Sequence, residues 1–103
     1  MPKLQLALDT ISLEDAFRLV EQLESKIDIV EVGTPLVLKY GLKAVSELKH
    51  KFHSLEILCD AKIMDAGGYE SGITFAAGAD WVTVMAFTDT ATIEQCVEAS
   101  KKA

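Results

Sequence analysis

The sequence predicts an α/β domain with a parallel sheet, and three observations support this prediction. Short apolar, β-branched runs occur at residues 4–8, 28–32, 54–60 and 80–85. Each run is followed by a segment whose apolar residues recur every three or four positions, which is typical of an amphipathic helix. Glycine, proline or helix-capping residues separate the segments. Strand–helix alternation of this kind favours parallel strands joined by right-handed crossovers. Two architectures fit: four units of an eight-fold β/α barrel, or a small doubly wound open sheet.

Helix-end signals agree with this order. Ser12 precedes two acidic residues, so it can cap a first helix whose first turn carries negative charge. A second helix is predicted over residues 37–49 and a third over residues 69–77. Gly78 is well placed to end the third helix. Residues 89–90 offer a cap for the last one.

Composition restricts the class of protein. At 103 residues, half of them hydrophobic, the chain is expected to form one domain over residues 1–103 with its own core. A net charge of −6 argues against a nucleic-acid binder or a protein of anionic membranes. No signal-peptide pattern or membrane-length apolar stretch occurs, so a cytoplasmic location is expected. Cys59 and Cys96 have no metal-type spacing and are interpreted as reduced packing residues.

Charged residues gather where the predicted strands end. Asp9, Glu31 and Asp60 end three successive strands, and Lys62 and Asp65 follow closely. In parallel sheets these ends share one rim, which indicates a divalent-metal or proton-transfer site. Oxygen ligands favour magnesium, calcium or manganese, with Glu31 and Asp60 as the candidate ligands. Lys62, beside so many acids, is expected to stay protonated and to stabilise an enolate oxygen or donate a proton.

Other residues of reactive type have simpler interpretations. The charged cluster itself has an alternative reading as a solvated strand end. His50 and His53 lie before the third strand, at the opposite end from the acids, and are expected to be solvated. Cys59 alternates with its charged neighbour and is expected to pack in the core. Trp81 is interpreted as structural.

Four segments carry a family resemblance: residues 6–9, 29–35, 60–70 and 77–80. They read Leu-Ala-Leu-Asp, Ile-Val-Glu-Val-Gly-Thr-Pro, Asp-Ala-Lys-Ile-Met-Asp-Ala-Gly-Gly-Tyr-Glu and Ala-Gly-Ala-Asp. The chain resembles the 3-hexulose-6-phosphate synthase family, within the orotidine monophosphate decarboxylase superfamily, over nearly its whole length. The Asp-x-Lys-x-x-Asp element marks the superfamily, and the residues around it point to the synthase.

The resemblance implies a lyase of the aldolase type. Its reaction is a magnesium-dependent addition of formaldehyde to D-ribulose 5-phosphate, which fixes formaldehyde in the ribulose monophosphate pathway. The family's metal ligands map to Glu31 and Asp60, and Asp9, Lys62 and Asp65 map to the polar groups around the reacting carbons. In this family the sites lie near a dimer interface, so Asp65 is expected to reach toward the partner's site.

The chain also departs from the family pattern. Members are about twice this length and close a complete barrel. The resemblance therefore covers an N-terminal half, without the strands that supply the catalytic-base histidine and the phosphate-binding groups. Phe87 stands where a small residue is expected. We expect a half-barrel with little or no synthase activity of its own, which forms a homodimer or a larger assembly through its exposed edges.

Two other functions fit parts of the pattern. A 3-keto-L-gulonate-6-phosphate decarboxylase would share the acidic and lysine positions. A non-catalytic module, either a flavodoxin-like signalling domain or an engineered half-barrel made to assemble, would share the alternation. The signalling domain requires a further strand carrying a lysine, which this sequence lacks.

Overall fold

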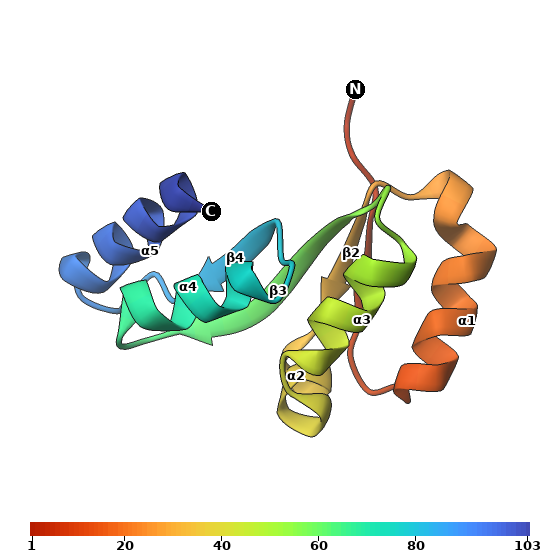
Figure 1. Cartoon of the computed structure of the whole chain (residues 1–103), viewed down its shortest axis with the longest axis horizontal. Coiled ribbons are helices and arrows are strands. Elements are labelled where there is room, and N and C mark those ends of the chain that lie inside the picture. The colour runs from red at the N-terminus through yellow and green to blue at the C-terminus, as the bar shows by residue number, and fades with distance from the viewer.

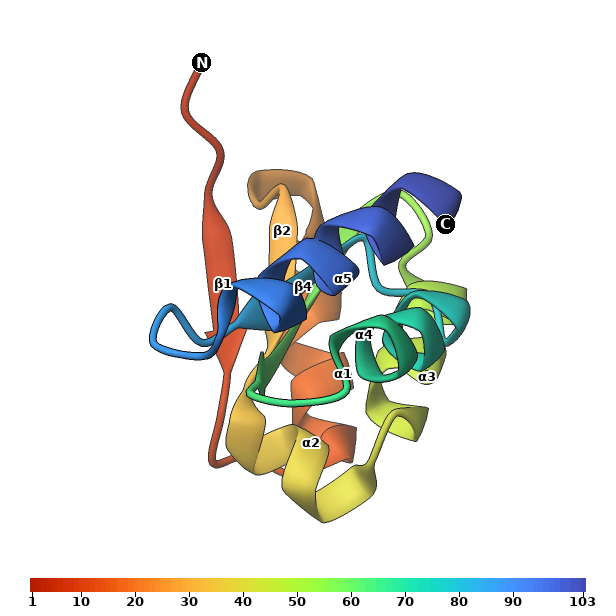
Figure 2. The same ribbon diagram turned by 90° about the vertical axis from the view of Figure 1, so that its left-hand side faces the viewer.

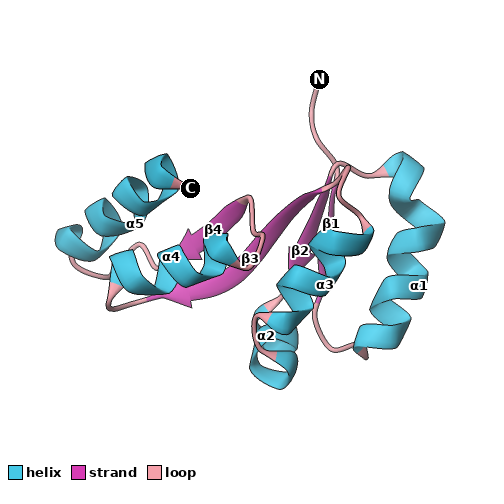
Figure 3. Ribbon diagram, in the orientation of Figure 1, coloured by secondary structure: helices cyan, strands magenta, loops and turns pink.

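The computed structural model describes all 103 residues, Met1–Ala103, and contains one parallel sheet. Its strands lie in sequence order, β1-β2-β3-β4 (Figure 3). They are β1 (Gln5–Leu8), β2 (Ile29–Val32), β3 (Glu56–Ile63) and β4 (Trp81–Val84). A doubly wound sheet reverses its strand order at a switch point, whereas a β/α barrel does not. The order therefore confirms half of a TIM-type barrel.

Five α-helices and one short 3₁₀ segment connect the strands (Figure 1). They are α1 (Leu13–Leu23), the 3₁₀ segment Glu24–Lys26, α2 (Thr34–Tyr40), α3 (Lys43–Lys51), α4 (Gly67–Ala76) and α5 (Thr90–Lys102). β3 runs from the end of the molecule that carries α1 and α3 to the end that carries α4 and α5 (Figure 1).

The core lies between the sheet and the helices. In β2, Val30 and Val32 are fully buried, whereas Ile29 and Glu31 on the opposite face are half-buried. This alternation places apolar side chains toward the helices and polar ones toward the concave, inner face of the half-barrel. Fifteen buried residues form one continuous hydrophobic cluster, which includes Cys59.

The N-terminus of α1 is capped as the sequence predicts. The Ser12 hydroxyl accepts a hydrogen bond from the Asp15 amide at 3.0 Å. Asp89 caps α5 in the same way, by accepting from the Thr92 amide at 2.7 Å. Each cap satisfies one of the amides that has no partner within the helix.

Replacing Ser12 with alanine is expected to lower the free energy of unfolding by about 1 kcal/mol, because an α1 amide loses its acceptor. Urea unfolding followed by circular dichroism measures the change. Ser12→Asp should retain most of the stability, and Ser25→Ala, at an exposed position, serves as the control. A Ser12→Ala variant as stable as the unmodified chain would show that the cap contributes nothing.

The predicted helix over residues 37–49 is wrong in one respect: it is two helices. α2 ends at Gly41, which has φ of +66° and whose amide donates to the Val37 carbonyl at 2.7 Å. Glycine adopts this left-handed conformation without the steric cost of a Cβ. α3 then starts at Lys43 and ends in a basic last turn that suits the helix dipole.

The third strand continues beyond its predicted end at Asp60. β3 extends to Ile63, and α4 begins at Gly67, two residues before the predicted start. The pairing of β3 with β4 is irregular between Cys59 and Ile63. Lys62 in that stretch has φ of +49°, which is uncommon for a residue with a side chain. Asp60 and Lys62 therefore lie on a distorted part of β3, and Asp65 lies in the loop that follows it.

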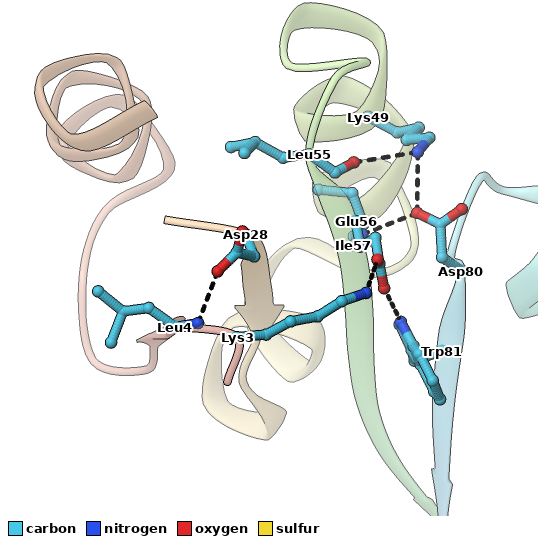
Figure 4. A network of polar contacts seen from close by, with 9 residues as sticks. All are labelled: Lys3, Leu4, Asp28, Lys49, Leu55, Glu56, Ile57, Asp80 and Trp81. Atoms are coloured by element: carbon cyan, nitrogen blue, oxygen red, sulfur yellow. Dashed lines mark hydrogen bonds and ion pairs between the residues drawn. The ribbon is translucent and has the colours of Figure 1, made fainter. Parts of the chain in front are cut away.

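A polar network fixes the opposite end of the sheet, where the strands begin (Figure 4). Asp80 accepts from the Ile57 amide and from Lys49 Nζ, both at 2.8 Å. Glu56 binds Lys3 and the Trp81 indole, and these two hydrogen bonds lower the pKa of its carboxyl group. Trp81 therefore has the structural role predicted for it.

β1 and β4 are the edge strands of the sheet (Figure 2). Trp81 on β4 is 49% exposed, and Phe87 just beyond that strand is 74% exposed. None of the helices combines the length and the apolar character that crossing a membrane requires.

Candidate active site

The residues predicted for the site reach the same rim of the sheet, at the carboxyl ends of the strands. Glu31 lies within β2 and Asp60 within β3, and Asp9 directly follows β1. Because all four strands are parallel, these positions share one edge.

Asp60 is the best-connected of these acids. Its Oδ1 accepts from the Thr83 hydroxyl at 2.7 Å. Its Oδ2 forms an ion pair with Lys62 Nζ and lies 3.1 Å from Thr34 Oγ1. The Asp60 side chain is only 16% exposed, whereas that of Lys62 is 50% exposed. These two side chains therefore meet, although Lys62 lies on a distorted part of β3.

The surroundings of Asp60 favour its charged form. Burial raises the pKa of this carboxyl group, but the hydrogen bonds from Lys62, Thr83 and Thr34 lower it by more. The net effect is a pKa below the ordinary aspartate value. Asp60 is therefore charged at neutral pH and is suited to bind a cation rather than to donate a proton.

Glu31 lies on β2, next to the strand that carries this pair, and one of its carboxylate oxygens is free. Its Oε1 accepts from Gln5 Nε2 at 2.7 Å, and its Oε2 has no hydrogen-bonding partner within the chain. β2 pairs with β3 so that Glu31 is opposite Leu58, two residues before Asp60 on the same face. Glu31 and Asp60 are therefore diagonal neighbours on the inner face.

Asp9 and Asp65 take more exposed places. The Asp9 carboxylate packs against Gly33, where a Cβ would lie 1.9 Å from Asp9 Oδ1. Asp65 lies between β3 and α4, and its Oδ1 accepts from the Ala66 amide at 2.7 Å. Neither carboxylate is hydrogen-bonded to Asp60 or Lys62. The structure thus brings Asp60 and Lys62 into contact and leaves Asp9 and Asp65 as separate groups at the rim.

The donor set fits magnesium rather than a transition metal. No group of three or more His, Cys, Asp or Glu side chains is arranged to hold a metal ion. Magnesium requires fewer protein ligands, because it is usually bound by one or two carboxylates together with water and substrate oxygens. Glu31 Oε2 and the Asp60 carboxylate offer that set.

Two threonines were underestimated from the sequence. Thr34 contacts both Asp60 and Lys62, and nothing in the sequence analysis assigned it to the site. Thr83 contacts Asp60 and the Lys62 amide, and it too was not assigned to the site. One signal for Thr34 was its place three residues after Glu31, directly after the glycine that ends β2.

The remaining reactive side chains take no part in this cluster. Cys59 and Cys96 are both free and buried. Burial, followed by the nearby Asp60 charge, raises the pKa of the Cys59 thiol to about 11, so this residue is no nucleophile at neutral pH. His50 and His53 are exposed and precede β3, at the opposite end from Asp60.

Comparison with known proteins gives one consistent result. The family model for "Orotidine 5'-phosphate decarboxylase / HUMPS family" matches residues 2–103. The 3-hexulose-6-phosphate synthase of Bacillus subtilis (strain 168) is 52% identical over 100 residues, which are 97% of this chain and 48% of that protein. The chain therefore spans about half the length of the curated relatives that it matches.

Solved structures agree with this match. The 3-hexulose-6-phosphate synthase from Salmonella typhimurium superposes with a TM-score of 0.96 at 46% identity, covering 98% of this chain and 48% of that one. The 3-keto-L-gulonate-6-phosphate decarboxylase from Vibrio cholerae gives 0.94 at 40% identity, covering 98% and 47%. Because sequence and fold both match over nearly the whole chain, the chain belongs to the orotidine 5'-phosphate decarboxylase / HUMPS family.

Proposed function

We propose that this chain supplies the metal-binding and lysine-bearing side of a 3-hexulose-6-phosphate synthase site. The observation that carries the proposal is the Asp60–Lys62 pair at the rim, with Glu31 as a diagonal neighbour of Asp60 on the adjacent strand. The names of the relatives support the reaction class, and the Bacillus subtilis synthase is the relative reported with 52% identity. The substrates would be D-ribulose 5-phosphate and formaldehyde.

Lys62 is suited to stabilise the charge that forms on the sugar. Its ammonium group has three donors, and Asp60 and Thr34 take two of them. The third remains available to a substrate oxygen on the exposed side. When C1 of the sugar loses its proton, negative charge spreads onto the neighbouring oxygen atoms, and a pre-positioned ammonium lowers the energy of that charge. C1 then forms a bond with the formaldehyde carbon, whose oxygen takes up a proton.

Glu31 and Asp60 would hold the magnesium ion. When bound there, the ion supplies Lewis-acid stabilisation of the developing charge. We place Asp9 and Asp65 around the reacting carbons, where they would accept hydrogen bonds from sugar hydroxyl groups. Proton abstraction and phosphate binding are assigned to groups outside these 103 residues, because both histidines lie at the other end of the sheet. We therefore expect little or no synthase activity from the 103-residue chain alone.

A decarboxylase acting on 3-keto-L-gulonate 6-phosphate is the second candidate. The Vibrio cholerae decarboxylase has nearly the same fold, with a TM-score of 0.94. In that reaction the same ammonium and metal would stabilise an enediolate formed by loss of carbon dioxide. The two candidates differ in substrate and not in the residues of this half of the site.

A chimera tests which reaction this half supports. The chain replaces the corresponding half of the Bacillus subtilis synthase, and circular dichroism with thermal unfolding verifies that the product folds. We expect formaldehyde-dependent consumption of ribulose 5-phosphate that requires Mg²⁺. Asp60→Asn in the same chimera, which removes a ligand charge, should abolish that activity. Decarboxylation without any synthase activity would contradict the proposal and favour the second candidate.

We further propose that the isolated chain associates with a second copy of itself. Edge strands with unpaired main-chain groups favour pairing, and β1 and β4 are such edges. Ile29 and Leu58 are only half-buried on the inner face, and Trp81 is half-exposed beside them. Sedimentation velocity at micromolar concentration is expected to show dimers or larger species. A compact monomer over the whole concentration range would contradict this.

A further inference from the structure

We propose that Thr83 and Thr34 are positioning residues that fix the Asp60 carboxylate and Lys62 in the arrangement needed for metal binding and charge stabilisation. This inference rests on the proposed function. The hydroxyl groups of these residues, on β4 and at the start of α2, stabilise the irregular end of β3 in the conformation that the site needs.

The distortion of β3 lies opposite Thr83. Cys59 pairs with Val82 and Ile63 pairs with Val84, so residues 60–62 stand opposite the single residue Thr83. Extra residues on one strand form a bulge, and bulges next to functional sites redirect side chains. Both charged residues of the pair belong to this stretch.

The distortion requires a compensating acceptor. Lys62 has φ of +49°, a conformation that is unfavourable for a residue with a Cβ. Its amide donates to Thr83 Oγ1 at 2.9 Å. The Thr83 side chain thus provides an acceptor for a main-chain amide in the irregular part of the ladder.

The direction of the hydrogen bonds at Thr83 is fixed by chemistry. A main-chain amide can only donate, so Thr83 Oγ1 accepts from Lys62. Its own proton is therefore available to Asp60 Oδ1, 2.7 Å away. One hydroxyl group thereby links the conformation of the Lys62 backbone to the orientation of the Asp60 carboxylate.

Thr34 holds the other side of the pair. Its Oγ1 accepts from Lys62 Nζ at 2.8 Å and lies 2.7 Å from the Asp60 carbonyl oxygen. The Thr34 hydroxyl has one proton to donate, and the Asp60 carbonyl oxygen at 2.7 Å is a closer acceptor than Asp60 Oδ2 at 3.1 Å. Thr34 therefore orients the Lys62 ammonium group, and Asp60 Oδ2 retains a lone pair that can bind a metal ion. The methyl group of each threonine restricts χ1 and hence the direction of the hydroxyl.

Isosteric substitution separates hydroxyl function from packing. Thr83→Val retains the shape of the side chain and leaves the Lys62 amide and Asp60 Oδ1 without their partner. Thr83→Ser retains the hydroxyl. Partners of metal ligands typically contribute 10- to 100-fold to metal affinity, so Thr83→Val and Thr34→Val should each weaken Mg²⁺ binding by about that factor. Thr88→Val is the matched control, because the Thr88 hydroxyl donates to the Met64 carbonyl and not to Asp60 or Lys62.

Two readouts on the full chain test the inference. The first is the Mg²⁺ dissociation constant from titration calorimetry. The second is hydrogen exchange of the Lys62 amide measured by NMR without the ion. We expect Thr83→Val to bind Mg²⁺ more weakly and to exchange that amide about tenfold faster. Thr83→Ser and Thr88→Val should remain close to the unmodified chain in both measurements.

The two readouts keep this inference separate from the proposed function. If the unmodified chain binds no Mg²⁺, the proposed metal site is wrong, and the exchange of the Lys62 amide still decides whether Thr83 holds the bulge. Unchanged exchange in Thr83→Val would overturn the positioning role of that residue. Unchanged Mg²⁺ affinity in both valine variants would overturn the role of both threonines toward the ion. Thr34→Val supplies the test if Thr83→Val does not fold.

Discussion

Replacing Gly33 with alanine is expected to lower the free energy of unfolding by about 2 to 3 kcal/mol. A Cβ at this position would lie 2.5 Å from the Leu8 carbonyl oxygen and 1.9 Å from Asp9 Oδ1. The carboxylate can move, but the carbonyl oxygen belongs to β1 and also accepts the Gly33 amide at 2.8 Å. The added methyl group therefore forces β1 and β2 apart where they lead into the site. Urea unfolding at neutral pH measures the loss.

A second glycine provides the matched control. Gly72 lies within α4, and a Cβ there would meet no atom within 4 Å. Gly72→Ala is expected to stabilise the chain by about 0.5 to 1 kcal/mol, because alanine loses less backbone entropy in a helix. If Gly33→Ala were as stable as the unmodified chain, the close approach of Gly33 to β1 would be wrong.

Replacing Asp60 with alanine is expected to destabilise the chain by about 2 kcal/mol at pH 7. The substitution removes the acceptor for the Thr83 hydroxyl and the ion-pair partner of Lys62. Asp65→Asn is the control, because Asp65 accepts only a local hydrogen bond from the Ala66 amide. An alanine variant at least as stable as the unmodified chain would show that these contacts do not hold the rim together.

The effect of Asp60→Ala should depend on pH in a defined direction. Because the pKa of Asp60 is lowered in the folded chain, its stabilising contribution is complete above the pKa of the unfolded chain, near 4. That contribution is lost as the pH falls through the lower, folded pKa. Unfolding curves of the two proteins should therefore converge below pH 4. A stability difference that is constant from pH 7 to pH 2.5 would contradict this.

The regular parts of the fold were predictable because each one has a local cause. Ser12 and Asp89 cap helices through their own side chains, and apolar spacing places the strands. The periodicity of the sequence could not distinguish a half-barrel from an open sheet, because both folds share the same strand–helix alternation. It depends on strand order, which is a property of tertiary packing.

The site was predictable in its residue types and less so in its geometry. The spacing of Asp60 and Lys62 placed them on one face, and they do meet. The bulge that carries them was not predictable, since it depends on the Thr83 hydroxyl from another strand. The contact of Thr34 with Asp60 was missed for the same reason: it joins groups 26 residues apart. Long-range hydrogen bonds of this kind leave no periodic signal.

The most direct test of the account is a Mg²⁺ titration of the chain followed by the amide signals in two-dimensional NMR. We expect saturable changes in the amide chemical shifts of Glu31, Asp60 and Lys62, which lie at the rim. These shifts should disappear in Asp60→Ala. An absence of shifts at millimolar Mg²⁺, or shifts only at the exposed acids of α1, would contradict the claim that this rim is the magnesium side of a sugar-phosphate aldolase.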